Sequence, residues 1–242
     1  MIKIQFYLRF HTRYGQSIWI TGNADELGNN DPSKAIAMNY LNDEFWHGSI
    51  EINRKNAPKN IVYKYILKNE DGELLFEWGH DRNISLLKDI SEITTSDIWN
   101  HAGEYENSFF TAPFKNVLLK EDHSKIKADS DKDPTHIFRV KAPLLKKGEA
   151  LCLLGSNLKL GDWSTDKPML LGKNGDWWEI KLNLLECSFP IAYKYGVYNT
   201  KEKSFIGFEN GDNRILYTDA AKKKLSILHD GFVQFPNDTW KG

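Results

Sequence analysis

The stretch from Leu151 to Asn213 decides the fold of this chain. Its landmarks, in chain order, are LCLL (151–154), GSN (155–157), LGDW (160–163), WW (177–178), AYKYGV (192–197) and FENGDN (208–213). Short apolar segments broken by Gly, Asn and Asp are typical of β-strands joined by turns. Aromatic residues on such turns, each close to a Lys, Asn or Glu, suit a ligand with apolar faces and a hydroxyl rim. A pyranose sugar is such a ligand.

The composition indicates a globular β-protein. The chain has 242 residues, of which 40% are hydrophobic and 13% aromatic, which is enough for one large or two medium domains. Strand-forming residues outweigh helix formers along most of it, and this favours an all-β sandwich or barrel. The two cysteines, Cys152 and Cys187, form no CxxC motif, so two buried thiols are the simpler interpretation.

Charge and hydropathy argue against several partners. The formal net charge of −1 provides no long-range field toward nucleic acid or an anionic membrane. No apolar run approaches the roughly 18 residues of a membrane helix. The N-terminal segment, Met1–Phe10, alternates apolar and polar residues as a strand does and lacks the apolar core of a signal peptide. We therefore expect no nucleic-acid or membrane partner and a cytoplasmic location.

The landmarks occur twice. Gly22 precedes Gly155 by 133 positions, and the YKY motif at 63–65 precedes the one at 193–195 by 130 positions. Further pairs in the same order are Leu27-Gly28 with Leu160-Gly161, Asn83 with Asn213, and more loosely Asp97-Ile98-Trp99 with Asp238-Thr239-Trp240. This order and spacing predict a tandem repeat of one β-domain.

The predicted boundaries follow from composition. Residues 119–134 are charged, nearly free of apolar side chains and end at Pro134, which is typical of a linker. We therefore expect a first domain at 1–118, a charged linker at 119–134 and a second domain at 135–242. The apolar stretch at 109–119 is expected to pack, and we expect it to lie between the two domains.

The ordered set of motifs resembles the family 20 carbohydrate-binding modules, the starch-binding domains. The resemblance covers almost the whole chain except the linker and implies an antiparallel, immunoglobulin-like β-sandwich for each copy. It also implies binding of α-1,4-glucans (starch, glycogen and maltooligosaccharides) at one or two surface sites per module. The motifs that carry it are YGQSIWITG (14–22), LG (27–28), YKYI (63–66) and EW (77–78) in the first copy, and LGS (154–156), LGDW (160–163), YKY (193–195) and FE (208–209) in the second.

The resemblance also implies site residues. For the family's first site in the second copy these are Trp163, Lys194, Phe208, Glu209 and Asn213, with Trp163 and Phe208 as two rings set at an angle.

In the first copy Lys64, Trp78 and Asn83 match the family's first site, but Asn30 stands where the stacking Trp is expected. This site is therefore expected to be weak or lost. The family's second site is matched by Tyr14 and, more loosely, by Tyr40. In the second copy Lys147 stands in the place of Tyr14.

Tandem modules of this kind with such a linker resemble the N-terminus of one class of 4-α-glucanotransferase of glycoside hydrolase family 77. We therefore expect this chain to be the carbohydrate-binding part, with Asp238–Gly242 leading toward a catalytic domain that is absent from it. A non-catalytic module without cofactor follows from this expectation.

Enzyme motifs are missing from the sequence. It contains no GxSxG, HExxH, P-loop or dinucleotide fingerprint, and its seven histidines have no ligand spacing, so no metal site is expected. Glu209 lacks an evident second carboxylate for glycoside hydrolysis. The alternative interpretation is a protein-interaction or structural β-sandwich, because a sandwich fold alone decides no function.

Overall fold

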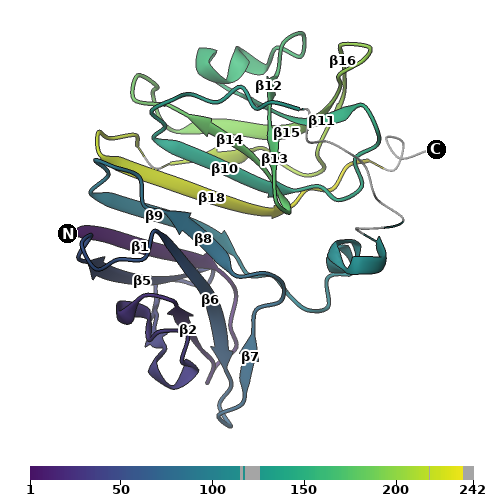
Figure 1. Cartoon of the computed structure of the whole chain (residues 1–242). Helices are drawn as coiled ribbons and strands as arrows, with labels where there is room; N and C mark the ends of the chain where they lie inside the picture. Colours follow the sequence, from purple (N-terminus) through teal and green to yellow (C-terminus); the bar gives the residue numbers. More distant parts are fainter. Residues whose placement is uncertain (115–116, 118–125, 218, 237–242) are drawn as a thin grey trace. The chain divides into compact units, whose positions relative to one another are not determined.

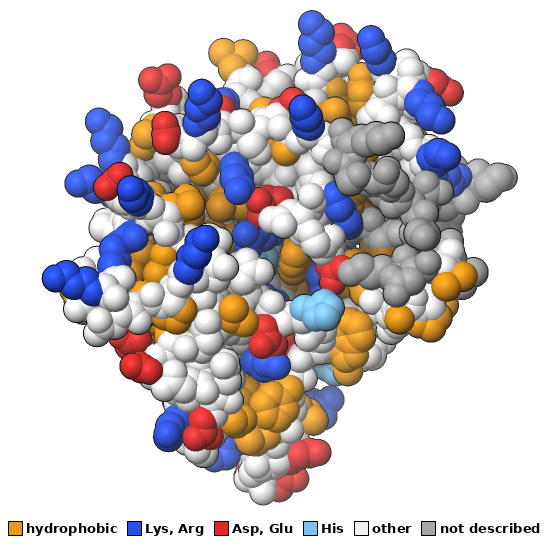
Figure 2. All heavy atoms as spheres, viewed as in Figure 1, with side chains coloured by type: hydrophobic (Ala, Val, Ile, Leu, Met, Phe, Trp, Pro, Cys, Tyr) orange, Lys and Arg blue, Asp and Glu red, His pale blue; other side chains and the backbone are white. Residues whose placement is uncertain are grey.

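The computed structural model describes residues 1–114, 117, 126–217 and 219–236 (Figure 1). The chain divides into two compact units. The first unit comprises Met1–Glu104 with Lys223–His229, and the second comprises Tyr105–Lys222 with Asp230–Gly242. Both signs of charge are interspersed on the face drawn in Figure 2.

The first unit consists of two facing sheets. In one sheet β4, β5, β1 and β9 are neighbours in that order, and β9 also pairs with the segment Lys224–His229 of β18 (Lys224–Phe232). In the other, β3, β2, β6 and β7 are neighbours, and β8 pairs with the first part of β6. The strands are β1 (Ile2–Arg9), β2 (Ser17–Gly22), β3 (Ile36–Ala37), β4 (Asn39–Tyr40), β5 (Phe45–Ile52), β6 (Asn60–Lys68), β7 (Leu74–Phe76), β8 (Arg82–Ser85) and β9 (Glu92–Ile98), and the short 3₁₀ helices are η1 (Asp25–Leu27) and η2 (Pro32–Lys34).

The second unit repeats this plan. Strands β12, β11, β15 and β16 are neighbours in one sheet, with β17 on the first part of β15, while β10, β14 and β13 are neighbours in the other. Its elements are η3 (Tyr105–Phe110), β10 (His136–Lys141), β11 (Glu149–Gly155), η5 (Leu158–Trp163), β12 (Met169–Leu170), β13 (Gly172–Asn174), β14 (Trp177–Leu182), β15 (Ile191–Asn199), β16 (Ser204–Phe208), β17 (Arg214–Leu216) and β18 (Lys224–Phe232).

The predicted all-β class, with two sandwich units in tandem, is confirmed. One detail differs from a fully antiparallel arrangement, since β1 and β18 both pair with β9 in parallel. A parallel neighbour needs a long crossover connection, and strands β2 to β8 of the first unit supply that connection between β1 and β9. Alternation then buries every second residue of β1, beginning with Ile2 and ending with Leu8.

Part of the predicted linker is fastened to the second unit. Asp129 exchanges hydrogen bonds with Leu170 of β12 through its backbone N–H and its carboxylate, at 3.0 and 2.8 Å. The carboxylate of Asp131 accepts from the backbone N–H of Asn183 at 2.7 Å and pairs with Lys159 at 2.8 Å. Residues 118–125 and Asp238–Trp240, which the sequence analysis also interprets, lie outside the described residues. The limits 1–118, 119–134 and 135–242 stay a prediction.

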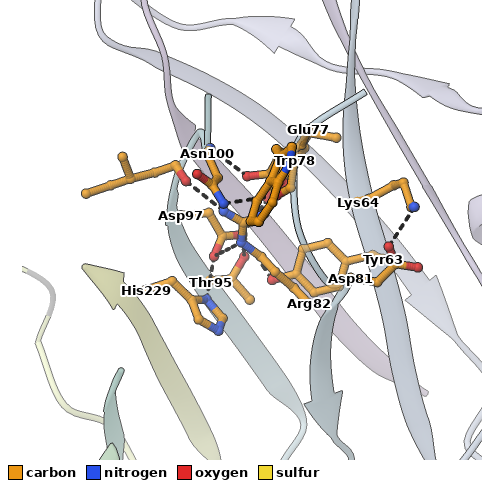
Figure 3. Close-up of polar contacts among 12 residues, drawn as sticks. Tyr63, Lys64, Glu77, Trp78, Asp81, Arg82, Thr95, Asp97, Asn100 and His229 are labelled. Atoms are coloured by element: carbon orange, nitrogen blue, oxygen red, sulfur yellow. Dashed lines mark hydrogen bonds and ion pairs between the residues drawn. The ribbon is translucent and has the colours of Figure 1, made fainter. Parts of the chain in front are cut away.

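A buried carboxylate joins the two sheets of the first unit (Figure 3). Asp97 in β9 is fully buried. Its Oδ2 accepts hydrogen bonds from the hydroxyl groups of Tyr63 and Tyr65 in β6, at 3.0 and 2.5 Å. Its Oδ1 lies 2.5 Å from Nδ1 of His229 and 3.5 Å from Nε of Arg82. Burial alone would raise the pKa of Asp97, but His229 and Arg82 hold it well below its usual range.

The second unit contains the same arrangement around Asp230. The hydroxyl groups of Tyr193 and Tyr195 donate to its carboxylate at 3.0 and 2.7 Å, and Arg214 lies 3.8 Å from it. Here burial outweighs the opposing effects of Arg214 and the tyrosines, so the pKa of Asp230 is raised. The two units therefore have an aspartate in equivalent surroundings, but the pKa is lowered for Asp97 and raised for Asp230.

This contrast generates a prediction. Asp97→Asn should lower the free energy of unfolding at pH 7 by about 3–5 kcal/mol, because the amide puts an N–H group against existing donors and removes a charge paired with Arg82. Asp230→Asn should cost clearly less, because ionisation of Asp230 is disfavoured in the folded state. Urea unfolding followed by tryptophan fluorescence measures both losses.

The pH dependence has a defined sign. A depressed pKa in the folded state contributes stability above the ordinary carboxyl pKa of 3.8, and that stability disappears as the pH falls further. The difference between wild type and Asp97→Asn should therefore shrink below about pH 4. Equal losses for the two variants, or a loss from Asp97→Asn that is independent of pH, would contradict the assignment.

Candidate functional site

The turn that carries Trp163 has an unusual backbone. The side chain of Asn157 accepts a hydrogen bond from the N–H of Leu160 at 2.9 Å and begins the turn. Gly161, Asp162 and Trp163 then follow with φ values of +79°, +47° and +60°. This left-handed region suits glycine and is tolerated by Asp, but it is costly for a bulky residue. Such strain is found where function maintains it.

The first unit makes the same turn without strain. Gly28, Asn29 and Asn30 have φ values of +77°, +54° and +60°, and Asn is a residue that adopts this conformation readily. The backbone of the turn is thus the same in both units. Because the second unit places a tryptophan where asparagine would be less strained, Trp163 is the stronger candidate for a functional residue.

Trp163 and Phe208 form an angled pair of rings. Their centroids lie 6.3 Å apart with an interplanar angle of 73°, and both side chains are half-buried. Phe205 packs against Phe208 at 4.7 Å and supports it from within β16. The two rings that the sequence analysis pairs are therefore in contact.

Lys194 and Asn213 belong to the elements that flank these rings. Lys194 alternates in β15 with the buried Tyr193 and Tyr195, so its side chain lies on the outer face of the sheet. Its Nζ donates to the carbonyl oxygen of Gly211 at 2.5 Å, which holds the turn between β16 and β17. Asn213 is exposed in that turn. Both residues are positioned to offer polar groups beside the rings.

Glu209 differs from what the resemblance implies. Its side chain is only 4% exposed, and its two carboxylate oxygens accept from Arg214 at 3.0 and 2.8 Å. It also accepts from the backbone N–H of Tyr195 at 3.0 Å. These bonds occupy Glu209 in holding the β16–β17 turn to β15, so it shapes the site and does not face a ligand.

The strand register shows which residue of the first unit corresponds to Phe208. Glu77 pairs with Arg82 as Glu209 pairs with Arg214, and each member of one pair precedes its counterpart by 132 positions. Phe76, paired with Ile66, therefore corresponds to Phe208, paired with Gly196. Trp78, which the motif match predicts for this position, lies two residues beyond it. The shared Glu-x₄-Arg spacing is the sequence signal that identifies Phe76.

The other residues expected in the first unit are in different surroundings. Lys64 forms an ion pair with Asp81 at 2.7 Å (Figure 3), and Asp81 occupies the position of Asn213. Asn83 lies in β8, opposite Val62. Trp78 is half-buried, and its backbone exchanges hydrogen bonds with Asn100. With Asn30 on the turn, the first unit does not bring together the ring pair seen in the second.

Tyr14 and Tyr40 both present rings to solvent. Tyr14 is 99% exposed in the turn before β2, and Tyr40 in β4 is 55% exposed. The hydroxyl group of Tyr40 donates to Asp43 at 2.5 Å, and its ring lies edge-on to Trp46 at 5.5 Å. Both residues therefore remain candidates for contact with a ligand.

Among the described residues, no group of three or more His, Cys, Asp or Glu side chains could hold a metal ion. Among the same residues, no helix is long and apolar enough to span a membrane.

Two β-sandwich units, one of which carries an angled pair of aromatic rings at an outer turn, are an arrangement that suits a carbohydrate-binding module. The family model described as "Starch binding domain" matches this chain at residues 1–96 and again at 135–227. The chain belongs to the starch-binding domain family, and the two matches confirm the predicted tandem repeat.

Three known proteins show what this chain is similar to. A 4-α-glucanotransferase, DPE2, from Oryza sativa subsp. japonica is 26% identical over 261 aligned positions, which cover 100% of this chain and 27% of that protein. Glucoamylase-1 from Schizophyllum commune is 37% identical over 101 positions, or 40% of this chain and 16% of that protein. The family 20 module of a maltotetraose-forming amylase from Pseudomonas saccharophila is 21% identical with a TM-score of 0.33, covering 40% of this chain and all of that one. The chain thus spans only a minor part of the first two relatives.

The burial of Glu209 generates a prediction for the site. Glu209→Ala should lower the free energy of unfolding by roughly 3 kcal/mol, because it removes the carboxylate that pairs with Arg214 and accepts from the N–H of Tyr195. Glu202→Ala, which removes an exposed carboxylate, is the matched control and should change stability by less than about 0.5 kcal/mol. Thermal and urea unfolding measure both. A Glu209→Ala variant of wild-type stability with impaired sugar binding would restore the role implied by the resemblance.

Proposed function

We propose that this chain binds α-1,4-glucans without catalysing a reaction on them, and that its main site is formed by Trp163, Phe208, Lys194 and Asn213. The observation that carries this proposal is the strained conformation of Trp163, which is combined with its angled contact to Phe208. Membership of the starch-binding family supports the ligand class.

The ring pair suits the shape of the ligand. Each face of a glucose ring carries C–H groups, and burying them on an aromatic ring stabilises the complex by about 25 cal/mol per Å². A ring with few rotatable bonds binds at low entropic cost. Two rings at 73° to each other fit successive glucose units of a curved α-1,4-glucan better than those of a flat chain. Lys194 and Asn213 provide polar groups for the hydroxyl rim.

The proposal extends to an attached enzyme. The rice relative contains about three quarters of its length outside the aligned region, since this chain covers 27% of it. We propose that the two modules hold a 4-α-glucanotransferase catalytic domain on its glucan. Linking modules raises the effective concentration of the second binding event without any new contact.

A protein-interaction role is the second candidate, and one observation favours it for the first unit. Lys64 is engaged with Asp81, and Asn30 provides no ring. The exposed rings of that unit could instead contact a protein partner. Sugar binding by variants of each unit separates the two functions.

Titration calorimetry with β-cyclodextrin and maltoheptaose tests the proposal. Trp163→Ala should weaken binding at least tenfold, a loss of about 1.4 kcal/mol. Tyr217→Ala, which removes an aromatic ring that is 75% exposed in the same unit, is the matched control and should bind as the wild type does. Trp78→Ala should also bind as the wild type does, because Phe76 and not Trp78 corresponds to Phe208.

Two results would count against the proposal. Absence of heat with either ligand at about 10 mM would contradict glucan binding itself. Binding that survives Trp163→Ala but is lost with Tyr14→Ala would move the working site to the first unit.

A further inference from the structure

The outer face of the β2–β6–β7 sheet in the first unit carries two aligned rows of side chains. In one row Trp19, Ile66 and Phe76 are in register across the three strands, and in the next row Ser17, Lys68 and Leu74 are in register. Alternation turns the intervening residues inward. The second row supplies polar groups next to an aromatic row.

A groove of about 240 Å³ lies on this face. Trp19, Ile66, Lys68 and Leu74 line it from the strands, and Pro32, Ser33 and Ala35 line it from η2 and its end. Leu74 is 40% exposed and Phe76, next in the aromatic row, is 47% exposed. Figure 2 shows hydrophobic side chains gathered in the lower part of the view, where Figure 1 draws β7. The volume is below the 300–1,000 Å³ of a pocket that encloses a ligand, so the groove suits a chain lying along the surface.

The indole ring of Trp19 is held in place. Its Nε1 donates to Oγ of Ser17 at 3.0 Å, and Nζ of Lys68 lies 5.5 Å from the ring centroid. Lys68 is exposed, and an exposed cation–π contact contributes only about 0.5–1 kcal/mol. A ligand can therefore displace the ammonium group from the ring and use it as a hydrogen-bond donor.

The corresponding row in the second unit is organised differently. Cys152, Gly196 and Phe208 are in register across β11, β15 and β16. Cys152 is fully buried, and Phe205 fills the space beside Gly196, since a Cβ there would lie 2.5 Å from its ring. The ring that accompanies Phe208 therefore comes from the turn, as Trp163. In the first unit the turn has Asn30, but the strand provides Trp19.

We propose that the Trp19 groove is a second α-glucan site, in which a ring on the strand replaces the ring missing from the turn. Trp19 provides the stacking face, while Lys68 and Ser33 provide polar groups for the sugar hydroxyls. Phe76 continues the apolar surface along the row. This inference rests on the proposed function, because the ligand is of the same class.

The experiment uses the full chain without Trp163, the ring at the tip of the turn in the second unit, and without Tyr14, the more exposed of the Tyr14 and Tyr40 rings. In a Trp163→Ala/Tyr14→Ala background, maltoheptaose should still bind, and the indole N–H signal of Trp19 should shift in ¹H–¹⁵N NMR spectra during titration. Trp19→Val, which suits a strand because it is β-branched, should weaken this binding at least fivefold. Trp19→Tyr, which restores a ring, should recover most of it. Thermal unfolding of each variant confirms that the fold is retained.

The outcomes separate this inference from the proposed function. If the wild type binds maltoheptaose but the background variant does not, the Trp19 site is refuted and glucan binding through Trp163 or Tyr14 stands. If the background variant binds equally well with Trp19 and with Val at that position, the groove is again refuted. If the wild type binds no glucan, both proposals fail.

Discussion

In each unit an aspartate joins the two sheets; Asp97 is fully buried, and the side chain of Asp230 is 12% exposed. Asp97 receives two tyrosine hydroxyls from β6, and Asp230 receives two from β15. A carboxylate that accepts several donors in a dry interior fixes their geometry strongly. Because the tyrosines must point inward, the residues between and after them must point outward. Lys64 and Lys194, which alternate with these tyrosines, thus lie on the outer face of the sheet because of a bond made on its inner face.

The Glu–Arg pair extends this order to the adjoining turn. Glu209 binds Arg214 and the backbone of Tyr195, so the residues between Glu209 and Arg214 are held at both ends. The backbone directly after Phe208 is thereby held in place. A preformed site loses little side-chain entropy on binding, which suits a shallow surface that gains no affinity from enclosure.

The sequence was sufficient for the class of fold and for the ring pair. Alternating apolar residues and turn-forming Gly, Asn and Asp predict strands, and Trp163 lies in a turn where burial is difficult. The motif match assigns Trp78 instead of Phe76 as the counterpart of Phe208, because the number of residues between equivalent positions changes along the repeat. The YKY motifs are 130 positions apart, but the Glu–Arg pairs are 132 apart, and the hairpin of the second unit contains a register shift between Val197 and Tyr198. Because side chains alternate with a period of two, a slip of two residues keeps the same face and leaves no hydrophobic mismatch to reveal it.

The role of Glu209 could not be predicted from its neighbours in sequence. The local sequence around an acidic residue next to an aromatic residue is the same whether the carboxylate faces solvent or pairs with an arginine. Only the position of Arg214 in the folded hairpin distinguishes the two. In the same way, the alignment of Trp19 with Phe76 depends on three strands whose pairing is a tertiary property.

The left-handed turn shared by Asn30 and Trp163 has a consequence for how such modules diverge. Its backbone shape is the same with either residue, so the side chain at its tip is free to change while the sandwich stays intact. After a duplication, one copy can lose a platform and the other keep it through a single substitution, with no intermediate that misfolds. A tandem of similar scaffolds can therefore acquire unequal affinities for a ligand while the backbone of the turn stays the same.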